Sequence, residues 1–249
     1  MTLVKICGIK TPEEAREVAS LDVDFLGAIF AKSKRQVSAQ TAREIVSIAH
    51  AAGKKCVGVF AGQSDCEIME ICEFVPLDAA QIHGEVSSNL YANLKAMGLK
   101  VWRVYSVLDK LPAVDTALCD MPLFDCKGEN AGGNGISFDW EILRTVKFDF
   151  GMAGGIGEHN AREAVKFNPR VLDLNSKVED KNGIKSAEKI NKIFKNLYNE
   201  LYKIGLKKIE DADKNSFEIL NDEFSKDKNN VYYYGNKING VSPDGLEFV

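Results

Sequence analysis

The 249-residue chain lacks several features that mark whole classes of protein. Its six cysteines include no CxxC pair and are scattered through apolar segments, so we expect neither a disulfide framework nor a zinc site. It has no basic excess, because the net charge is -4, so we expect no nucleic-acid partner. Its N-terminus has no long apolar run, which argues against a signal peptide and a membrane span. We therefore expect a cytoplasmic protein.

Residues 1–202 alternate short apolar runs with longer amphipathic segments, which is typical of repeated βα units around a parallel sheet. The predicted strands are residues 3–9, 24–30, 55–60, 79–84, 100–106, 122–126, 148–154 and 171–176. Eight strands, each followed by a helix, predict a closed (β/α)8 TIM barrel. The alternative is an open doubly wound sheet, which usually has fewer strands and often a glycine-rich turn after the first one. Here the first strand ends in Cys-Gly-Ile.

Several helix boundaries can be predicted from single residues. Thr11 and Ser38 stand at N-cap positions, and Pro12 occupies the first turn. Gly53 and Gly98 end two helices just before the next strand, as glycine does at helix C-termini. Residues 185–201 supply the eighth helix.

Residues 203–249 differ in composition and form a predicted second module. Asn, Asp and Lys rise there, and three of the seven tyrosines stand together at 232–234. When the tail is aligned with itself at an offset of 29 residues, residues 208–220 match residues 237–249. The tail therefore contains about one and a half repeats. Because a repeat buries its apolar face only against neighbours, we expect a partly disordered tail unless it packs on the barrel.

In a barrel, reactive side chains belong at the carboxyl ends of strands. Cys7 ends the first predicted strand and Asp125 lies at the end of the sixth. A thiol that faces an anion-binding pocket with basic residues is a candidate base, and a desolvated carboxylate is a candidate acid. The alternatives are a small core cysteine and a structural carboxylate satisfied by backbone N–H groups.

A phosphate site is predicted after the last two strands. Gly154 and Gly155 precede a helical segment and allow backbone N–H groups to approach an anion. Asn175 and Ser176 add donors from the following loop, and phosphate sites recur at this place in barrels. The alternative is a tight turn that only needs the conformational freedom of glycine.

Three other candidates are less specific. Arg35 lies in a polar loop and is either a bidentate clamp for a substrate carboxylate or a solvated surface charge. Gln81 and His83 end the fourth strand; the histidine is equally compatible with a core position and with a role facing the substrate. The glycine-rich loop 129–143 is either a lid or a plain connection.

The motifs VKICGI, GAIFAKSKRQVS, VGVF, AQIHG, FD with GGNGISFDW, and MAGGI followed by LDLNSKVED occur in this order across residues 3–201. Together they resemble the phosphoribosylanthranilate isomerase family. The resemblance implies an Amadori rearrangement in tryptophan biosynthesis, which converts N-(5-phosphoribosyl)anthranilate to 1-(2-carboxyphenylamino)-1-deoxyribulose 5-phosphate. It implies a phosphosugar substrate and no cofactor or metal.

The resemblance also implies roles for single residues. Cys7 corresponds to the family's base and Asp125 to its acid. Arg35 is expected to hold the anthranilate carboxylate, and Asp173 to lie near the anthranilate amine. The loops at 154–155 and 175–176 are expected to hold the phosphate, and a homodimer or an association with indole-glycerol-phosphate synthase is a possible assembly.

Two features depart from the family pattern. The family usually reads VDVSSGVE around the last strand, so Asn175 and Lys177 replace a serine and a glycine, and Lys177 adds a Cβ to the phosphate loop. The tail resembles the repeats of DKNYY-type bacterial proteins.

Two other functions compete with the isomerase. A related phosphate-binding barrel, such as indole-glycerol-phosphate synthase, is expected to carry aspartate or lysine where Cys7 stands. A noncatalytic barrel that has lost its activity is the second, and the presence of both Cys7 and Asp125 argues against it.

Overall fold

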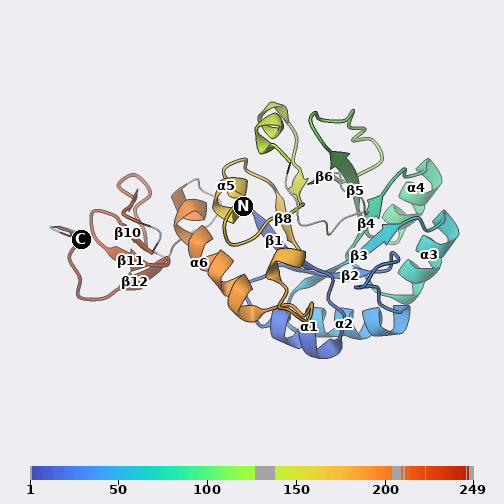
Figure 1. Ribbon diagram of the computed structural model, residues 1–249, viewed down its shortest axis with the longest axis horizontal. Coiled ribbons are helices and arrows are strands. Elements are labelled where there is room, and N and C mark those ends of the chain that lie inside the picture. Colours follow the sequence, from blue (N-terminus) through green and yellow to red (C-terminus); the bar gives the residue numbers. More distant parts are fainter. Residues whose placement is uncertain are drawn as a thin grey trace.

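The structure, a computed structural model, describes residues 2–126, 138–203, 209, 211–221, 223–244 and 246, with residues 198–203 described by their backbone only. It contains a closed barrel of eight parallel strands and a four-stranded antiparallel sheet formed by the tail (Figure 1). The predicted (β/α)8 fold class is confirmed.

Each barrel strand pairs with the next along the chain, and β1 closes the barrel by pairing with β8. The strands are β1 (Leu3–Cys7), β2 (Phe25–Ile29), β3 (Lys55–Ala61), β4 (Ala79–His83), β5 (Lys100–Val107), β6 (Met121–Cys126), β7 (Gly151–Met152) and β8 (Val171–Leu174). All eight fall within or close to the predicted ranges. The largest difference is β7, which has only two residues where 148–154 was expected.

Helices cover the outside of the barrel. They are α1 (Pro12–Ala19), α2 (Ala39–Ala51), α3 (Asp65–Phe74), α4 (Ser88–Ala96), α5 (Ala161–Val165) and α6 (Ala187–Lys203), with 3-10 helices η1 (Trp140–Thr145) and η2 (Ser176–Val178). The predicted caps are confirmed, because Thr11 and Ser38 accept from the backbone N–H groups of Glu14 and Thr41. Gly53 and Gly98 adopt φ of 70° and 83°, the left-handed conformation that favours glycine at helix ends.

The expected helix after every strand is wrong between β5 and β6. Residues 108–120 form no helix there, and Pro112 removes a backbone donor that a helix would need. The Tyr105 hydroxyl fixes this connection instead, since it donates to the Asp115 carbonyl at 2.8 Å and accepts from the Asp115 N–H at 3.2 Å. The described part of the next connection contains only the short helix η1.

The barrel interior divides into two halves along the strands. Alternate residues of a strand point inward, and the inward residues near the amino ends form an apolar cluster that includes Phe25, Val57, Trp102, Leu123 and Val171. Further along, the inward positions of β4, β6 and β8 become polar, while β2 and β3 still present the apolar Ile29 and Val59. The half of the interior near the amino ends of the strands, called the lower half below, is therefore a packed core. The half near their carboxyl ends, called the upper half, is available for a site.

The described part of the tail forms a small antiparallel sheet of its own. Its strands, in the spatial order β12-β11-β10-β9, are β9 (Glu218–Ile219), β10 (Phe224–Lys226), β11 (Val231–Tyr233) and β12 (Asn236–Ile238). Tyr232 is completely buried against Ile209, and its hydroxyl donates to Asp227 at 2.7 Å.

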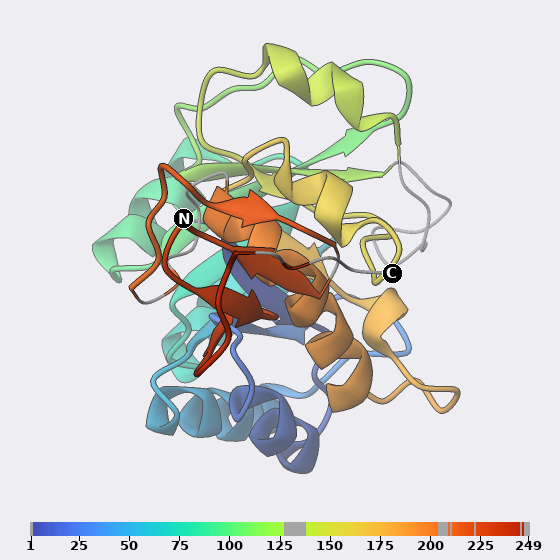
Figure 2. The ribbon, with the colours of Figure 1, turned by 90° about the vertical axis from the view of Figure 1, so that its left-hand side faces the viewer.

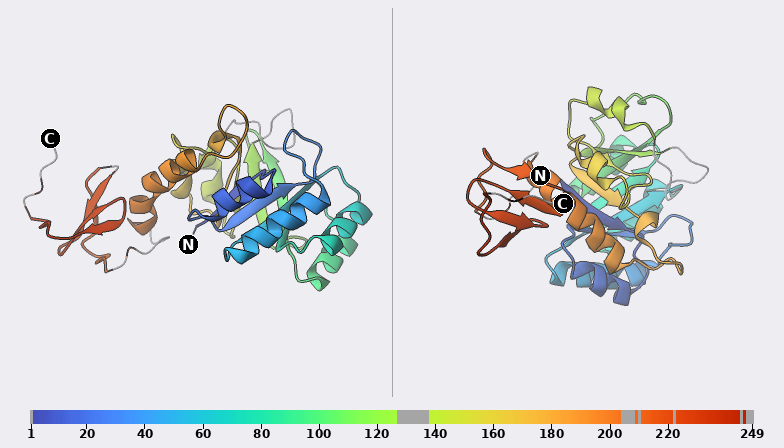
Figure 3. Two further views of the ribbon diagram at one scale, coloured as in Figure 1. Left: turned by 90° about the horizontal axis from the view of Figure 1, so that it is seen from below. Right: turned by 60° about the vertical axis from the view of Figure 1, so that its left-hand side comes forward.

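The tail sheet lies beside the later turns of α6 and projects away from the barrel (Figures 2 and 3). The Lys195 ammonium of α6 lies 5.1 Å from the centre of the Tyr234 ring, a cation–π contact between the helix and the tail. Helix α6 runs to Lys203, across the domain boundary expected after residue 202, so that boundary stays a prediction. None of the helices described is long and apolar enough to span a bilayer.

Candidate active site

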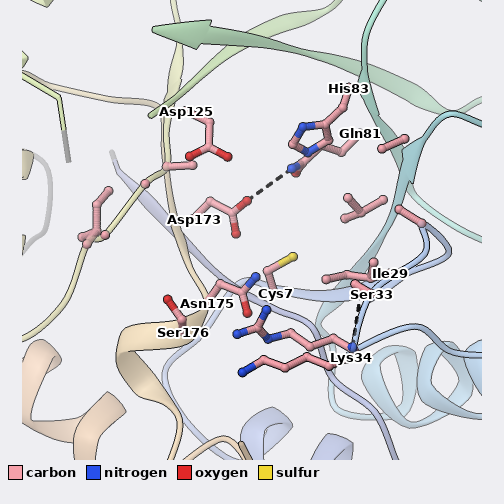
Figure 4. A pocket seen from close by; sticks show the side chains of 18 of the residues that line it. Cys7, Ile29, Ser33, Lys34, Gln81, His83, Asp125, Asp173, Asn175 and Ser176 are labelled. Atoms are coloured by element: carbon pink, nitrogen blue, oxygen red, sulfur yellow. Dashed lines mark hydrogen bonds between the residues drawn. The ribbon is translucent and has the colours of Figure 1, made fainter. Parts of the chain in front are cut away.

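A cavity of about 490 Å³ lies at the carboxyl ends of the barrel strands (Figure 4). The structure brings all the site residues predicted from the sequence to its wall: Cys7, Arg35, Gln81, His83, Asp125, Gly154, Gly155, Asp173, Asn175 and Ser176. They come from strands far apart in the sequence, and the closure of the barrel brings them together.

Asp125 is a carboxyl group that forms no ion pair with any of the described residues, although the charge of Lys5 acts on it. It points inward from the end of β6 and is 7% exposed. Burial, together with the negative charge of Asp173, raises its pKa to about 7. A carboxyl group with this pKa is partly protonated at neutral pH and can donate a proton to a substrate.

Cys7 ends β1 and faces the same space. Burial raises the pKa of its thiol, while the positive charges of Lys5 and Lys185 oppose that shift. The thiol is therefore the predominant form of Cys7 in the cavity at neutral pH. The thiolate is a minor species that the two ammonium groups stabilise.

Lys5 and Asp173 form a buried ion pair below Cys7. The Lys5 ammonium is completely buried and lies 2.9 and 2.8 Å from the two carboxylate oxygens of Asp173. Burial disfavours the charge of Lys5, but Asp173 and Cys7 outweigh it and raise the pKa of this lysine. Lys5 therefore keeps a positive charge beneath the Cys7 thiol.

Gln81 and His83 extend from β4 toward this pair. The Gln81 amide donates to Asp173 at 3.4 Å, and its side-chain oxygen is buried with no partner among the described residues. Burial lowers the pKa of His83 to about 4, so its imidazole is neutral at pH 7. A neutral imidazole offers hydrogen bonds to a substrate but no charge.

Arg35 is buried, so its interpretation as a solvated surface charge is wrong. Its Nε and Nη2 groups donate to the two oxygens of Glu179 at 2.5 and 2.9 Å. Nη1 has no partner in the described parts of the chain, and Arg35 lines the cavity. The guanidinium is thus held rigidly by Glu179, with one nitrogen left for a ligand.

The predicted phosphate site lies on a turn whose backbone conformation favours glycine. Gly154 and Gly155 have φ of 90° and 65°, which residues with a side chain rarely adopt. A Cβ on Gly154 would lie 2.9 Å from the Asp125 carboxylate and 2.8 Å from the Cys126 nitrogen. Glycine is therefore required here both for the turn and for its close approach to Asp125.

Lys177 fits the phosphate loop despite its Cβ. It belongs to η2 and does not adopt a positive φ. Its side chain packs over Gly157, where an added Cβ would lie 2.7 Å from the Cβ of Lys177. The missing side chain at Gly157 thus makes room for the lysine.

Sequence reasoning missed several residues that shape the site. Lys5 carried a signal, since a lysine at an inward position two residues before Cys7 interrupts an apolar strand. Glu179 and Lys185 carried none, because they lie in a polar segment that looks solvated. Gly27 was also missed, although a Cβ there would lie 3.0 Å from the Cys7 sulfur.

Two other points bear on the chemistry. Most of the proposed lid falls on residues 127–137, which lie outside the described residues. Among the residues that the structure describes, no group of three His, Cys, Asp or Glu side chains is arranged to hold a metal ion. What the cavity itself brings together is a buried carboxyl group, a thiol, the Arg35 guanidinium and the glycine turn at 154–155.

Comparison with known proteins agrees with this arrangement. The family model of N-(5'-phosphoribosyl)anthranilate (PRA) isomerase matches residues 4–196, and that of the DKNYY family matches residues 191–249. The N-(5'-phosphoribosyl)anthranilate isomerase of Campylobacter jejuni is 43% identical over 197 residues, covering 79% of this chain and 99% of the relative. A Streptococcus pneumoniae enzyme of the same name is 38% identical over 193 residues, covering 76% and 92%.

Solved structures agree as well. Phosphoribosyl anthranilate isomerase from Thermus thermophilus has a TM-score of 0.66 and 30% identity, covering 77% of this chain and 96% of that one. A phosphoribosyl anthranilate isomerase in complex with reduced 1-(o-carboxyphenylamino)-1-deoxyribulose 5-phosphate has a TM-score of 0.61 and 28% identity, covering 78% and 96%. The chain therefore belongs to the phosphoribosylanthranilate isomerase family, and its C-terminal segment matches the DKNYY family.

Proposed function

We propose that the barrel catalyses the Amadori rearrangement of N-(5-phosphoribosyl)anthranilate to 1-(2-carboxyphenylamino)-1-deoxyribulose 5-phosphate in tryptophan biosynthesis. Membership of the isomerase family supports this reaction. The observation that carries it is one cavity that holds a carboxyl group with a pKa raised to about 7 and, opposite it, a buried thiol flanked by cations.

The first step assigns Asp125 as general acid. Its protonated carboxyl group gives a proton to the furanose ring oxygen, the bond between C1 and that oxygen breaks, and the aryl nitrogen forms a protonated imine with C1. Burial keeps the proton on Asp125 at a pH where an ordinary aspartate has lost it.

The second step assigns Cys7 as general base. Its thiolate removes the proton from C2, and the electron pair of the C–H bond forms an enolamine that tautomerises to the ketone. An isomerisation gains and loses no protons overall, so the proton taken by Cys7 balances the one given by Asp125. One proton transferred back to Asp125 resets the enzyme.

The two anionic ends of the substrate fit two groups of donors. The Arg35 guanidinium holds the anthranilate carboxylate, and Asp173 and Gln81 lie toward the anthranilate amine. The backbone at Gly154 and Gly155, with Asn175 and Ser176, holds the phosphate. The neutral His83 also lines the cavity.

Turnover of freshly made phosphoribosylanthranilate, followed by the fall in its fluorescence, tests the proposal. We expect Cys7→Ala and Asp125→Asn to lose about 10²- to 10⁴-fold in kcat/KM, which is the usual contribution of one acid or base. Cys56→Ala is the matched control, because Cys56 is buried on β3 and does not line the cavity. A folded wild-type protein without turnover would contradict the assignment.

The proposal also includes the setting of the enzyme. We place it in the cytoplasm, as a homodimer or with indole-glycerol-phosphate synthase as a partner. The similar phosphoribosylanthranilate isomerase of Thermotoga maritima is dimeric, which supports a homodimer. Cell fractionation and size-exclusion chromatography of the whole chain check these points.

A further inference from the structure

Lys185 is a buried cation that connects the two anion-binding parts of the cavity without lining it. Its side chain has no exposed surface. Its ammonium donates to the Asn175 carbonyl at 3.1 Å, to the Asn175 side-chain oxygen at 2.9 Å and to Glu179 at 2.7 Å. Three acceptors around one nitrogen match the three N–H donors of an ammonium group, and this geometry works against burial, which lowers the pKa of Lys185.

Glu179 links this lysine to Arg35. The same Glu179 oxygen accepts from both the Lys185 ammonium and Arg35 Nε. Burial works against the charge of Glu179, but the two cations outweigh it and lower its pKa to about 2. One carboxylate between two cations leaves this buried cluster with a net positive charge beside a cavity proposed for a substrate with two anionic groups.

The backbone around the cluster is equally constrained. The two oxygens of Glu14 accept from the backbone N–H groups of Lys185 at 2.7 Å and Lys10 at 2.6 Å. A Cβ on Gly8 would lie 2.7 Å from the Arg35 side chain and 3.0 Å from the Asn175 side-chain oxygen. The turn after Cys7 therefore packs directly on the two residues that Lys185 holds in place.

We propose that Lys185 is a positioning residue that holds Arg35, through Glu179, and the Asn175–Ser176 loop in the geometry that binds the two anionic ends of the substrate. The identity of that substrate rests on the proposed function. Lys185 touches no reacting atom, and its effect on the reaction passes through Asn175 and Arg35.

The test compares Lys185→Met with Lys189→Met in the full-length protein. Lys189 is the matched control, because its ammonium also binds Glu179, but at the backbone carbonyl and from an exposed position. Inorganic phosphate is the first probe, with its dissociation constant measured by calorimetry. Anthranilate is the second, measured as an inhibitor of turnover.

We expect Lys185→Met to weaken the binding of phosphate and of anthranilate by about tenfold each, and to raise KM by about tenfold. The kcat should change less, because the lost interaction contributes to substrate binding. Lys189→Met should stay within about twofold of wild type, as is usual for an exposed lysine. A folded Lys185→Met protein with wild-type KM and phosphate affinity overturns the proposal, since a merely structural role affects only thermal stability.

If Lys185→Met fails to fold, Lys185→Gln repeats the comparison with one amide donor retained for the Asn175 carbonyl. The two proposals also fail separately. A wild-type protein that binds phosphate but does not turn over phosphoribosylanthranilate refutes the proposed function, whereas unchanged phosphate binding in the variant refutes the role of Lys185.

Discussion

The two halves of the barrel interior are lined by the same strands and differ in what they do. The lower half is apolar, with Trp102 and Phe25 in edge-to-face contact at 5.1 Å between ring centres. The upper half contains Lys5, Asp125 and Asp173, all buried. Burial stabilises the first set of side chains and costs free energy for the second. One strand such as β6 thus supplies Leu123 to the core and, two residues later, Asp125 to the site.

Substitutions in the lower half should have the largest effect on stability. Trp102→Ala removes a buried aromatic side chain, and we expect a loss of about 3–5 kcal/mol in the free energy of unfolding. The folded fraction should keep a wild-type KM, because Trp102 does not line the cavity. Urea unfolding and steady-state kinetics together check this, and a large rise in KM would mean that the two halves are not independent.

In the upper half, removing a charge should stabilise the protein. The pKa of Asp125 is about 7 in the folded protein and about 3.8 unperturbed, so its burial costs stability as pH rises through this range. The cost is complete above pH 7 and absent below pH 4. We expect Asp125→Asn to be more stable than wild type by up to about 4 kcal/mol at pH 8.

The same comparison at pH 4 is the control, because both proteins then carry a neutral group at position 125. Equal stability of the two proteins at pH 8 would show that Asp125 is not desolvated as described.

Contact between the glycine turn at 154–155 and Asp125 gives a smaller effect. Gly154→Ala places a Cβ at a positive φ and 2.9 Å from Asp125, and we expect a loss of about 1–3 kcal/mol in stability, together with lower kcat/KM. Gly53→Ala is the matched control, since Gly53 also has a positive φ but nothing within 4 Å of an added Cβ. Equal losses of activity in the two variants would contradict the contact with Asp125.

The tail should contribute least to the chemistry. Its described sheet touches α6 and not the cavity, so truncation after Lys203 is expected to leave kcat/KM within about twofold of wild type. Kinetics of the truncated chain beside the full chain measure this. A large loss of activity would show that the barrel depends on residues beyond α6.

The alternation of short apolar runs with amphipathic segments made much of this comparison predictable from sequence. It located the eight strands, and the barrel rule then placed Cys7 and Asp125 at the carboxyl ends of β1 and β6, which face the same cavity. Local chemistry also predicted the caps at Thr11 and Ser38.

The pairs that join distant parts of the chain were not predictable. Arg35 and Glu179 are 144 residues apart, and Lys5 and Asp173 are 168 apart, so no local pattern relates them. The missing helix between β5 and β6 has a similar cause, because the Tyr105 hydroxyl that fixes the connection acts through a tertiary contact. The two-residue strand β7 forms because it pairs with β6 and β8 on either side, and not because its own residues favour a strand.

The pH dependence of kcat/KM tests the central claim, that the upper half holds Asp125 as acid and Cys7 as base. The active form needs a protonated Asp125 and an ionised Cys7, although the pKa of the acid, about 7, lies below that of the thiol, which burial raises above 9. The account predicts that activity rises up to about pH 7, stays level and falls only above pH 9. A profile that is highest below pH 7 and falls through neutrality would contradict it.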